Sequence, residues 1–396
     1  MEWKEVRLGD VCSELSDGLH KAPKFIEKGE YIFVNAKNLY NGYILDNDPT
    51  KKTSHEEYIK YKKPLGKHTI LYSIDGTIGN IAKYRGEKCV LGKGACYLNC
   101  NPKMVESSYL YYQLQSPHFK SYIHLMSTGS TIKHISLKTM REYVFELPSL
   151  TDQRRIASIL SSLDRKIELN NKINADLEEM AQAIFKNWFV DFEPFKDGKF
   201  VDSELGMIPE GWKVGRLEDI AEIIMGQSPA GNSLNENREG MIFYQGSSDF
   251  GFRFPSIRVF TTEPKRLAVT NSVLFSVRAP VGDINVAKEE CCIGRGVASI
   301  KSKYDYDSYL FYTMKSLHKL FDSFDGEGTV FGSINKKTLS AIQILLPPDG
   351  IVEQFNNIAS SFDNRIRSLS DESSRLSLLR DTLLPHLMSG ELEVPE

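Results

Sequence analysis

The longest regular pattern in the chain is a stripe of mostly apolar positions that begins just after Pro148. Its members lie alternately four and three residues apart, which keeps them on one narrow face of a helix. Ser149 with Asp152 is typical of a helix start, and Pro194 predicts the end. At about 1.5 Å per residue the helix is a rod of about 60 Å, and so narrow a stripe requires a partner helix. The stripe is Ile156, Leu160, Leu163, Ile167, Asn170, Asn174, Leu177, Ala181, Ile184 and Trp188.

The same spacing returns 199 residues later and predicts the partner. The polar Asn170 and Asn174 suit the setting of helix register more than stability. Pro385 predicts that the second helix kinks or stops early. The alternative is two ordinary amphipathic helices in separate cores. The second stripe is Phe355, Ala359, Phe362, Ile366, Leu369, Ser373, Leu376, Arg380, Leu383 and Leu387.

The chain before the first long helix alternates short apolar runs with glycines, which predicts strands joined by turns. We expect strands at Tyr31 to Val34, Thr69 to Ser73, Ile78 to Tyr84 and Tyr143 to Leu147, and helices at Ser107 to Gln115 and Ser136 to Arg141. Residues 1–148 are therefore predicted to form a mixed α/β domain.

An internal repeat shows that the second half of the chain resembles the first. The offset falls steadily from 209 to 199 residues, as expected of two copies that differ by loop insertions. The matched segments include Trp3-Lys4 with Trp212-Lys213, Leu71 with Leu274, Gly92 with Gly294, and Ser108-Tyr109-Leu110 with Ser308-Tyr309-Leu310.

The predicted fold class is therefore α+β: two mixed α/β domains separated by two long antiparallel helices, an internal duplication with pseudo-twofold symmetry. The predicted boundaries are 1–148 for the first domain, 149–193 for the central helix, 194–211 for a linker, 212–347 for the second domain and 348–396 for the C-terminal helix.

Composition narrows the functional classes. The chain has 396 residues, with 49 basic against 52 acidic, so a nucleic-acid binder must concentrate its positive charge locally. Six scattered cysteines, a polar N-terminus and no long apolar run predict a cytoplasmic protein with reduced thiols and no membrane span.

No catalytic motif is found in the sequence. Gly86 and Gly92-Lys93-Gly94 have the wrong spacing for a phosphate loop, and no Ser or Thr follows the lysine. Cys96 and Cys100 have no second pair at a zinc-site spacing, so we interpret them as buried apolar residues. We expect no cofactor and no metal in this chain.

Residues 51–93 hold ten basic residues against four acidic ones, with tyrosines between them. Such a stretch can carry phosphate contacts, although a solvated face is an equal alternative. Small residues before Lys133 offer free backbone amides, and an ordinary turn is the alternative there. The DNA-binding candidates in the first copy are Lys21, Lys24, Asn35, Lys37, Asn38, Lys62, Lys63, Lys67, Gly129, Ser130, Thr131, Lys133 and His134.

The corresponding loops of the second copy carry amide and guanidinium groups, which read adenine and guanine edges bidentately. Divergent loops on a repeated scaffold predict two different half-sites. The candidates in the second copy are Gln227, Ser228, Gln245, Ser247, Arg253, Arg278, Gly328 and Thr329.

Several local motifs resemble the specificity subunit of type I restriction-modification systems, and the resemblance covers the whole chain. They are Gln153-Arg154-Arg155-Ile156, the run from Ile184 to Phe192, Asp202-Ser203-Glu204-Leu205-Gly206, Ile208-Pro209-Glu210-Gly211-Trp212 and Gly390-Glu391-Leu392.

The resemblance implies that each globular domain is a target-recognition domain, which reads one half of a bipartite, asymmetric sequence in double-stranded DNA. It also implies that the helices set the gap and dock two modification subunits, which use S-adenosylmethionine to methylate adenine. Restriction subunits that use ATP and magnesium then join. No catalysis is implied for this chain.

Two other classes remain open from the residues alone. One is an enzyme, a methyltransferase or nuclease with a disguised site, which methyl transfer by the isolated chain would reveal. The other is a structural adaptor that presents two protein-binding domains, which salt-dependent DNA affinity would exclude.

Overall fold

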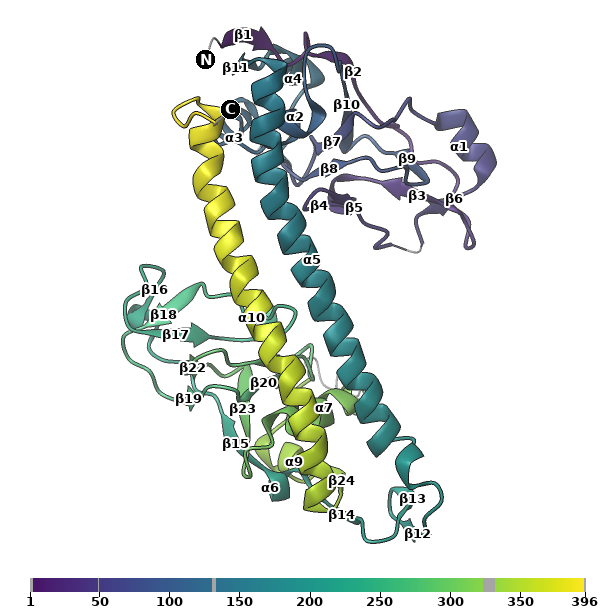
Figure 1. Cartoon of the computed structure of the whole chain (residues 1–396), viewed down its shortest axis with the longest axis vertical. Coiled ribbons are helices and arrows are strands. Elements are labelled where there is room, and N and C mark those ends of the chain that lie inside the picture. Colours follow the sequence, from purple (N-terminus) through teal and green to yellow (C-terminus); the bar gives the residue numbers. More distant parts are fainter. Residues whose placement is uncertain (1–2, 49, 130–132, 323–331, 395–396) are drawn as a thin grey trace. The chain divides into compact units, whose positions relative to one another are not determined.

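A computed structural model describes residues 3–48, 50–129, 133–322 and 332–394 (Figure 1). The chain divides into two compact units. Unit 1 is Met1–Leu169 with Glu372–Glu396, and unit 2 is Asn170–Asp371. The helices α5 (Leu150–Phe189) and α10 (Asp349–Met388), 40 residues each, contribute one part to each unit.

The main sheet of unit 1 is antiparallel, with strand order β2-β10-β7-β8. A second sheet has the order β6-β3-β9, in which β3 and β9 are parallel, and β1 pairs with β11. The strands are β1 (Lys4–Arg7), β2 (Cys12–Asp17), β3 (Tyr31–Val34), β4 (Leu39–Tyr40), β5 (Tyr43–Ile44), β6 (Lys52–Thr53), β7 (Thr69–Ser73), β8 (Ile81–Lys83), β9 (Cys89–Leu91), β10 (Ala95–Cys100) and β11 (Val144–Leu147).

Four shorter helices complete unit 1, and most of them begin at a side-chain cap. The Ser54 hydroxyl accepts from the backbone of Glu57, and Ser116 and Ser136 cap the next helices in the same way. The helices are α1 (His55–Tyr61), α2 (Ser107–Gln113), α3 (Pro117–Met126) and α4 (Leu137–Glu142).

Unit 2 has a main sheet of the same kind, with strand order β15-β23-β20-β21. Its second sheet, β16-β18-β17-β22-β19, again holds a parallel pair, β17 with β22. The strands are β14 (Lys213–Arg216), β15 (Ala221–Met225), β16 (Leu234–Asn235), β17 (Met241–Tyr244), β18 (Val259–Thr261), β19 (Leu267–Ala268), β20 (Val273–Ser276), β21 (Ile284–Val286), β22 (Cys291–Ile293), β23 (Val297–Ser302) and β24 (Gln343–Leu346). The helices are α6 (Leu217–Ile220), α7 (Asp307–Ser316), α8 (His318–Asp322) and α9 (Lys336–Ser340).

The long helices pack against each other inside each unit. In unit 1, Ile156 and Leu160 of α5 share a core with Leu384 and Leu387 of α10. In unit 2, Phe185 of α5 meets Phe355 of α10 at 5.5 Å between ring centroids and Asn174 donates to Ser370. In unit 1, Asp164 of α5 pairs with Arg380 of α10, and Lys166 pairs with Glu372. In both units, residues later in α5 therefore contact residues earlier in α10, so the paired segments are antiparallel.

The predicted stripes of α5 and α10 are the helix faces that are buried in the structure. Every position of both predicted stripes is buried or half-buried. The predicted cap of α5 is also present, since the backbone of Asp152 donates to the Ser149 hydroxyl at 3.2 Å. Burial of this face offsets the entropy of ordering two long helices.

Two local expectations are corrected by the structure. Residues 194–211 are not only a linker, because β12 (Phe200–Ser203) and β13 (Gly206–Pro209) pair in a hairpin. Gly206, with φ +93°, permits its tight turn. Helix α10 also continues past Pro385 to Met388. A proline in the last turn removes only one hydrogen bond, so the helix still ends where its apolar face ends.

Candidate nucleic-acid interface

The same corner appears in both units at the end of the parallel strand pair. In unit 1, Asn35 directly follows β3 and its Oδ1 lies so close to Gly92 that a Cβ there would overlap it. In unit 2, Gln245 follows β17, and a Cβ on Gly294 would meet its Oε1 at 2.6 Å. The repeated glycines Gly92 and Gly294 therefore permit close packing of an amide side chain. We call these residues the amide corners.

Each amide corner carries an exposed basic residue between its glycines. Lys93 stands there in unit 1 and Arg295 in unit 2, and both side chains are exposed. In unit 2 the Ser228 hydroxyl donates to the Gln245 Oε1 at 2.9 Å and accepts from the backbone of Arg295 at 3.3 Å. The amide of Gln245, the hydroxyl of Ser228 and the backbone of Arg295 thus lie together, and the neighbouring Gln227 is exposed. Arg295 was missed by sequence reasoning, although its glycine neighbours had been noticed.

Three DNA-binding candidates around β3 in unit 1 differ in how exposed their side chains are. Asn38 is only 3% exposed, and its amide donates to the Leu45 carbonyl and to the Asn47 side chain. Its expected role in base contact is therefore corrected to a structural one. Asn35 is half-buried, and exposed Lys37 lies 3.0 Å from Asp48. Asp48 raises the pKa of Lys37 through this hydrogen bond.

The basic stretch of unit 1 surrounds α1 and the strand β7. Lys62 and Lys67 are exposed, and Lys63 is half-buried with its ammonium 6.0 Å from the Tyr97 ring. Lys21 and Lys24 are exposed as well, and the backbone of Lys24 donates to Glu57. The exposed lysines can therefore contact phosphates, but no contact within the protein fixes the orientation of their side chains.

A cavity of about 630 Å³ opens inside this basic region. Lys67, Lys83 and Arg85 line it, opposed by Glu106. The Lys83 ammonium lies 3.3 Å from the Ser108 hydroxyl and 4.3 Å from the Tyr111 ring. Burial, and secondarily Arg85, lowers the pKa of Lys83 to about 8. Within this cavity a bound anion would favour the charged form of Lys83.

The loop before α4 is described only in part. Ser130 and Thr131, like Gly328 and Thr329 in unit 2, lie outside the described residues. Gly129 is exposed with φ +99°, and Lys133 is exposed. His134 is half-buried, 3.9 Å from Asp75.

The remaining unit 2 candidates lie on loops next to the strands. Ser247 begins a 3-10 turn, Ser247–Asp249, directly after the amide corner. Arg278 is exposed, and its backbone forms a bridge with Ser333. The Arg278 side chain is therefore open to solvent, whereas Ser247 is half-buried.

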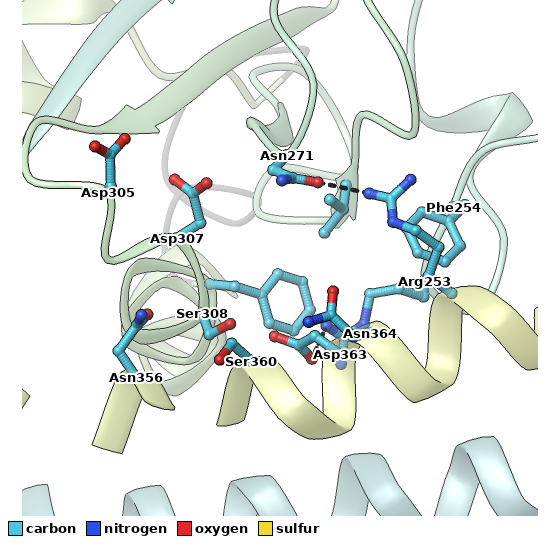
Figure 2. Close-up of a pocket in the computed structure, with 13 residues that line it drawn as sticks. Arg253, Phe254, Asn271, Asp305, Asp307, Ser308, Asn356, Ser360, Asp363 and Asn364 are labelled. Carbon is cyan, nitrogen blue, oxygen red and sulfur yellow. Dashed lines mark hydrogen bonds and ion pairs between the residues drawn. The ribbon is translucent and has the colours of Figure 1, made fainter. Parts of the chain in front are cut away.

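Arg253 is the clearest correction among the expected base readers. It is 3% exposed, and its Nε lies 3.1 Å from Glu178. Its Nη1 lies 2.6 Å from Asp363 of α10, and Figure 2 shows these two residues. Tyr312 accepts a further hydrogen bond at 2.9 Å, and Lys315 also pairs with Glu178. An arginine enclosed by two carboxylates cannot reach a base edge. Instead it ties its loop to α5 and α10.

Unit 1 contains an equivalent polar link. The Tyr112 hydroxyl donates to Asp164 at 2.5 Å, and Arg380 donates to the other oxygen of Asp164 at 2.8 Å. Burial, and then the hydrogen bond to Asp164, raises the pKa of Tyr112. We call the two groups the helix staples: Tyr112, Asp164 and Arg380 in unit 1, and Tyr312, Asp363, Arg253 and Glu178 in unit 2.

A cavity of about 260 Å³ lies beside the unit 2 staple, and part of its lining, Val286 and Ser308, corresponds to Lys83 and Ser108 of the basic cavity in unit 1. Both cavities border the first turn of the helix that follows the main sheet, at Ser108 and at Ser308. Figure 2 shows Asp305 and Asp307 in this cavity of unit 2, which is therefore less basic. Burial raises the pKa of Asp307, whose Oδ1 has no hydrogen-bond partner.

Catalytic and metal chemistry has little support in the described residues. Within the described ranges no group of three or more His, Cys, Asp or Glu side chains is arranged to hold a metal ion. Burial raises the pKa of Cys12, Cys89 and Cys291 to about 12, which suppresses their thiolates. Cys96 and Cys100 are buried in the core of unit 1. Among the residues that the structure describes, no helix is long and apolar enough to cross a membrane.

The comparisons with known protein families, sequences and structures all point to one family. The family model described as the type I restriction modification DNA specificity domain matches residues 1–179 and 209–376. A Methanocaldococcus jannaschii protein described as the MjaX type I restriction enzyme specificity subunit is 32% identical over 99% of this chain and 94% of that protein. The HindI specificity subunit of Haemophilus influenzae is 24% identical over 99% and 100%. The solved structure of a type I restriction-modification S subunit from M. genitalium covers 98% of this chain and 96% of its own, with a TM-score of 0.59 and 18% identity, and shows a likeness of fold.

Proposed function

The chain belongs to the type I restriction-modification DNA specificity family, and from this premise we propose that its two globular parts each read one half of a bipartite, asymmetric DNA sequence. Specificity subunits of this family recognise DNA and carry no catalysis. The two parts are proposed as target-recognition domains, residues 1–148 and 212–347, related by duplication and a pseudo-twofold axis. The observation that carries the proposal is the pair of amide corners.

The amide corners combine one framework with different reading groups. Asn35 and Lys93 occupy it in unit 1, and Gln245 and Arg295 occupy it in unit 2. Asn and Gln pair bidentately with adenine, and Arg prefers guanine, while Lys binds phosphate as a point charge. The same backbone with different side chains supports two half-sites of different sequence.

The long helices are proposed as the element that fixes the gap between the half-sites. Their apolar stripes are covered in both units, and a staple ties each globular part to both helices. The helices also dock two modification subunits, which bring S-adenosylmethionine for adenine methylation. Restriction subunits with ATP and magnesium join the same complex in the cytoplasm. In this assembly the chain recognises the DNA sequence and sets the spacing between the half-sites.

Methylome sequencing of cells that carry this chain and its modification subunit tests the proposal. The expected result is a motif in two parts. The double variant Gln245→Ala with Arg295→Ala should relax or change one half of the motif and leave the other half and the gap unchanged. Gln354→Ala, an exposed residue of α10, is the matched control. A single continuous motif, or equal changes in both halves, would contradict the proposal.

A further inference from the structure

The basic cavity of unit 1 carries more positive than negative charge. Lys67, Lys83 and Arg85 line it, and Glu106 is the one carboxylate among its described lining residues. None of the three cations forms an ion pair with another described residue. A cavity lined by positive charge that no carboxylate pairs with favours an anionic ligand.

The Lys83 ammonium is partly removed from water without gaining a charged partner. Its side chain is half-buried on β8, and the ammonium lies 3.3 Å from the neutral hydroxyl of Ser108. The rings of Tyr111 and Tyr112 lie 4.3 Å and 5.4 Å from it. An ammonium in such surroundings is stabilised by any anion that enters the cavity.

The charged groups around Lys83 do not supply that anion. Asp164 and Glu106 attract the ammonium at longer range, whereas Arg85 and Arg165 repel it. Asp164 is already engaged in the unit 1 staple by a tyrosine hydroxyl and a guanidinium. Glu106 accepts from a backbone N–H in the first turn of α2 at 3.4 Å. Each carboxylate therefore has a partner of its own, and the ammonium has no direct one.

The Arg85 guanidinium, which also lines the cavity, is held in a fixed orientation. Its Nη1 donates to the Gly42 carbonyl at 2.6 Å, and the guanidinium lies 4.1 Å from the centre of the Tyr43 ring. The side chain is nevertheless exposed, and no described residue accepts from its Nε or Nη2. These two donors can therefore bind two oxygens of one ligand at a small cost in side-chain entropy.

The cationic positions of unit 1 are neutral, apolar or ion-paired in unit 2. Strand β20 pairs with β21 as β7 pairs with β8, which fixes the correspondence between the two units. The equivalents of Lys67, Lys83 and Arg85 are Thr270, Val286 and Lys288. Lys288 is paired with Asp371. The unpaired positive charge is therefore a property of unit 1 and does not follow from the repeated fold.

We propose that the basic cavity of unit 1 binds a phosphate group through Lys83 and Arg85, with the exposed Lys67 beside them. The oxygens of a phosphate accept charge-assisted hydrogen bonds from both an ammonium and a guanidinium. A volume of about 630 Å³ admits a group as large as a nucleotide. The phosphate belongs either to the DNA backbone, in which case the inference rests on the proposed function, or to a free phosphate-bearing ligand. The experiments below distinguish these two sources.

The first experiment titrates the full chain, labelled with carbon-13 at the lysine ε-carbons, with inorganic phosphate at pH 8. The variant Lys83→Gln identifies the Lys83 signal. We expect this signal to move toward that of the charged form and the pKa of Lys83 to rise above about 8, because an anion favours the ammonium. Sodium chloride at the same ionic strength should produce about one tenth of the shift or less. Equal shifts with the two salts would overturn the proposal.

The variant Ser108→Asp supplies an anion from within the chain. It places a carboxylate beside the Lys83 ammonium, at a position in the first turn of α2 where negative charge is favoured. We expect a Tm at least as high as that of the wild type and phosphate affinity about tenfold lower or less. Arg85→Gln should also weaken phosphate by about tenfold. Ser121→Asp, which adds the same charge to an exposed position of α3, should change neither quantity. Unaltered phosphate affinity in the folded Ser108→Asp and Arg85→Gln chains would overturn the proposal.

The second experiment identifies the source of the phosphate by a parallel titration with duplex DNA that contains the methylated motif. If the DNA backbone occupies the cavity, the duplex shifts the Lys83 signal, and Ser108→Asp reduces the slope of log K against log salt by about 0.9. If a free ligand occupies it, inorganic phosphate shifts the signal and the duplex does not. Failure of both probes to move the Lys83 signal would overturn the proposal. A motif that is not bipartite would instead contradict the proposed function, whatever the phosphate titration shows.

Discussion

The two helix staples perform the same task with different burial. In unit 2, the side chains of Arg253 and Glu178 are 3% and 4% exposed, whereas in unit 1 Arg380 and Asp164 are each 31% exposed. Removing one partner of a buried pair leaves an uncompensated charge, while exposed pairs contribute little. The comparison teaches that equivalent polar links on a repeated scaffold need not contribute equally to stability.

The largest expected effect is therefore on the unit 2 staple. Arg253→Met should lower the free energy of unfolding by about 3 kcal/mol, because Glu178 stays buried with less compensation. Arg380→Met in unit 1 should cost at most about 1 kcal/mol. Chemical denaturation of the full chain measures both. Equal costs would show that burial does not distinguish the staples.

A smaller effect, on the pH dependence of stability, is expected from the difference between the cavities of the two units. Lys83 lines the cavity of unit 1, and Val286 stands at its strand position in unit 2. The pKa of Lys83 falls from 10.5 in the unfolded chain to about 8 in the fold. Between these values the unfolded chain binds more protons, so stability rises with pH.

Lys83→Met should remove a rise on the order of 1 kcal/mol between pH 7.5 and 9.5. The measurement is the difference in unfolding free energy between wild type and variant at the two pH values. Lys172→Met, an exposed lysine of α5, is the control. A constant difference in unfolding free energy across this pH range would contradict a lowered pKa for Lys83.

The last expected effect is on DNA binding, not on stability, and concerns the basic residues of the amide corners. If Lys93 contacts phosphate, Lys93→Ala reduces the slope of log K against log salt by about 0.9 for any DNA sequence. Arg295→Ala should instead lose discrimination at one base pair, by about 1–3 kcal/mol. Binding titrations over a salt series on cognate and substituted duplexes compare them. Identical behaviour of the two variants would mean that the corners do not differ in readout.

What the sequence predicted well depends on local periodicity. The heptad spacing identified both long helices and their covered faces, and the predicted strands Tyr31 to Val34 and Thr69 to Ser73 agree with β3 and β7. These signals are repeated within a few residues. They need no knowledge of distant parts of the chain.

What the sequence missed depends on long-range partners. Arg253 looked like a base reader because its carboxylates lie 75 and 110 residues away. Asn38 is a polar loop residue that the neighbouring turn buries. Arg295 could have been found from the sequence, because it lies between two glycines, as Lys93 does in unit 1. The proposed half-site contacts stay predictions.

The central claim, that the paired helices set the gap between two independent half-sites, is tested most directly by lengthening both helices. One heptad inserted after Asn170 and one after Asp371 keep each stripe in register and add about 10 Å, or about three base pairs. Methylome sequencing should then find both half-sites unchanged and a gap about three base pairs longer. An unchanged gap in an active complex would contradict the account.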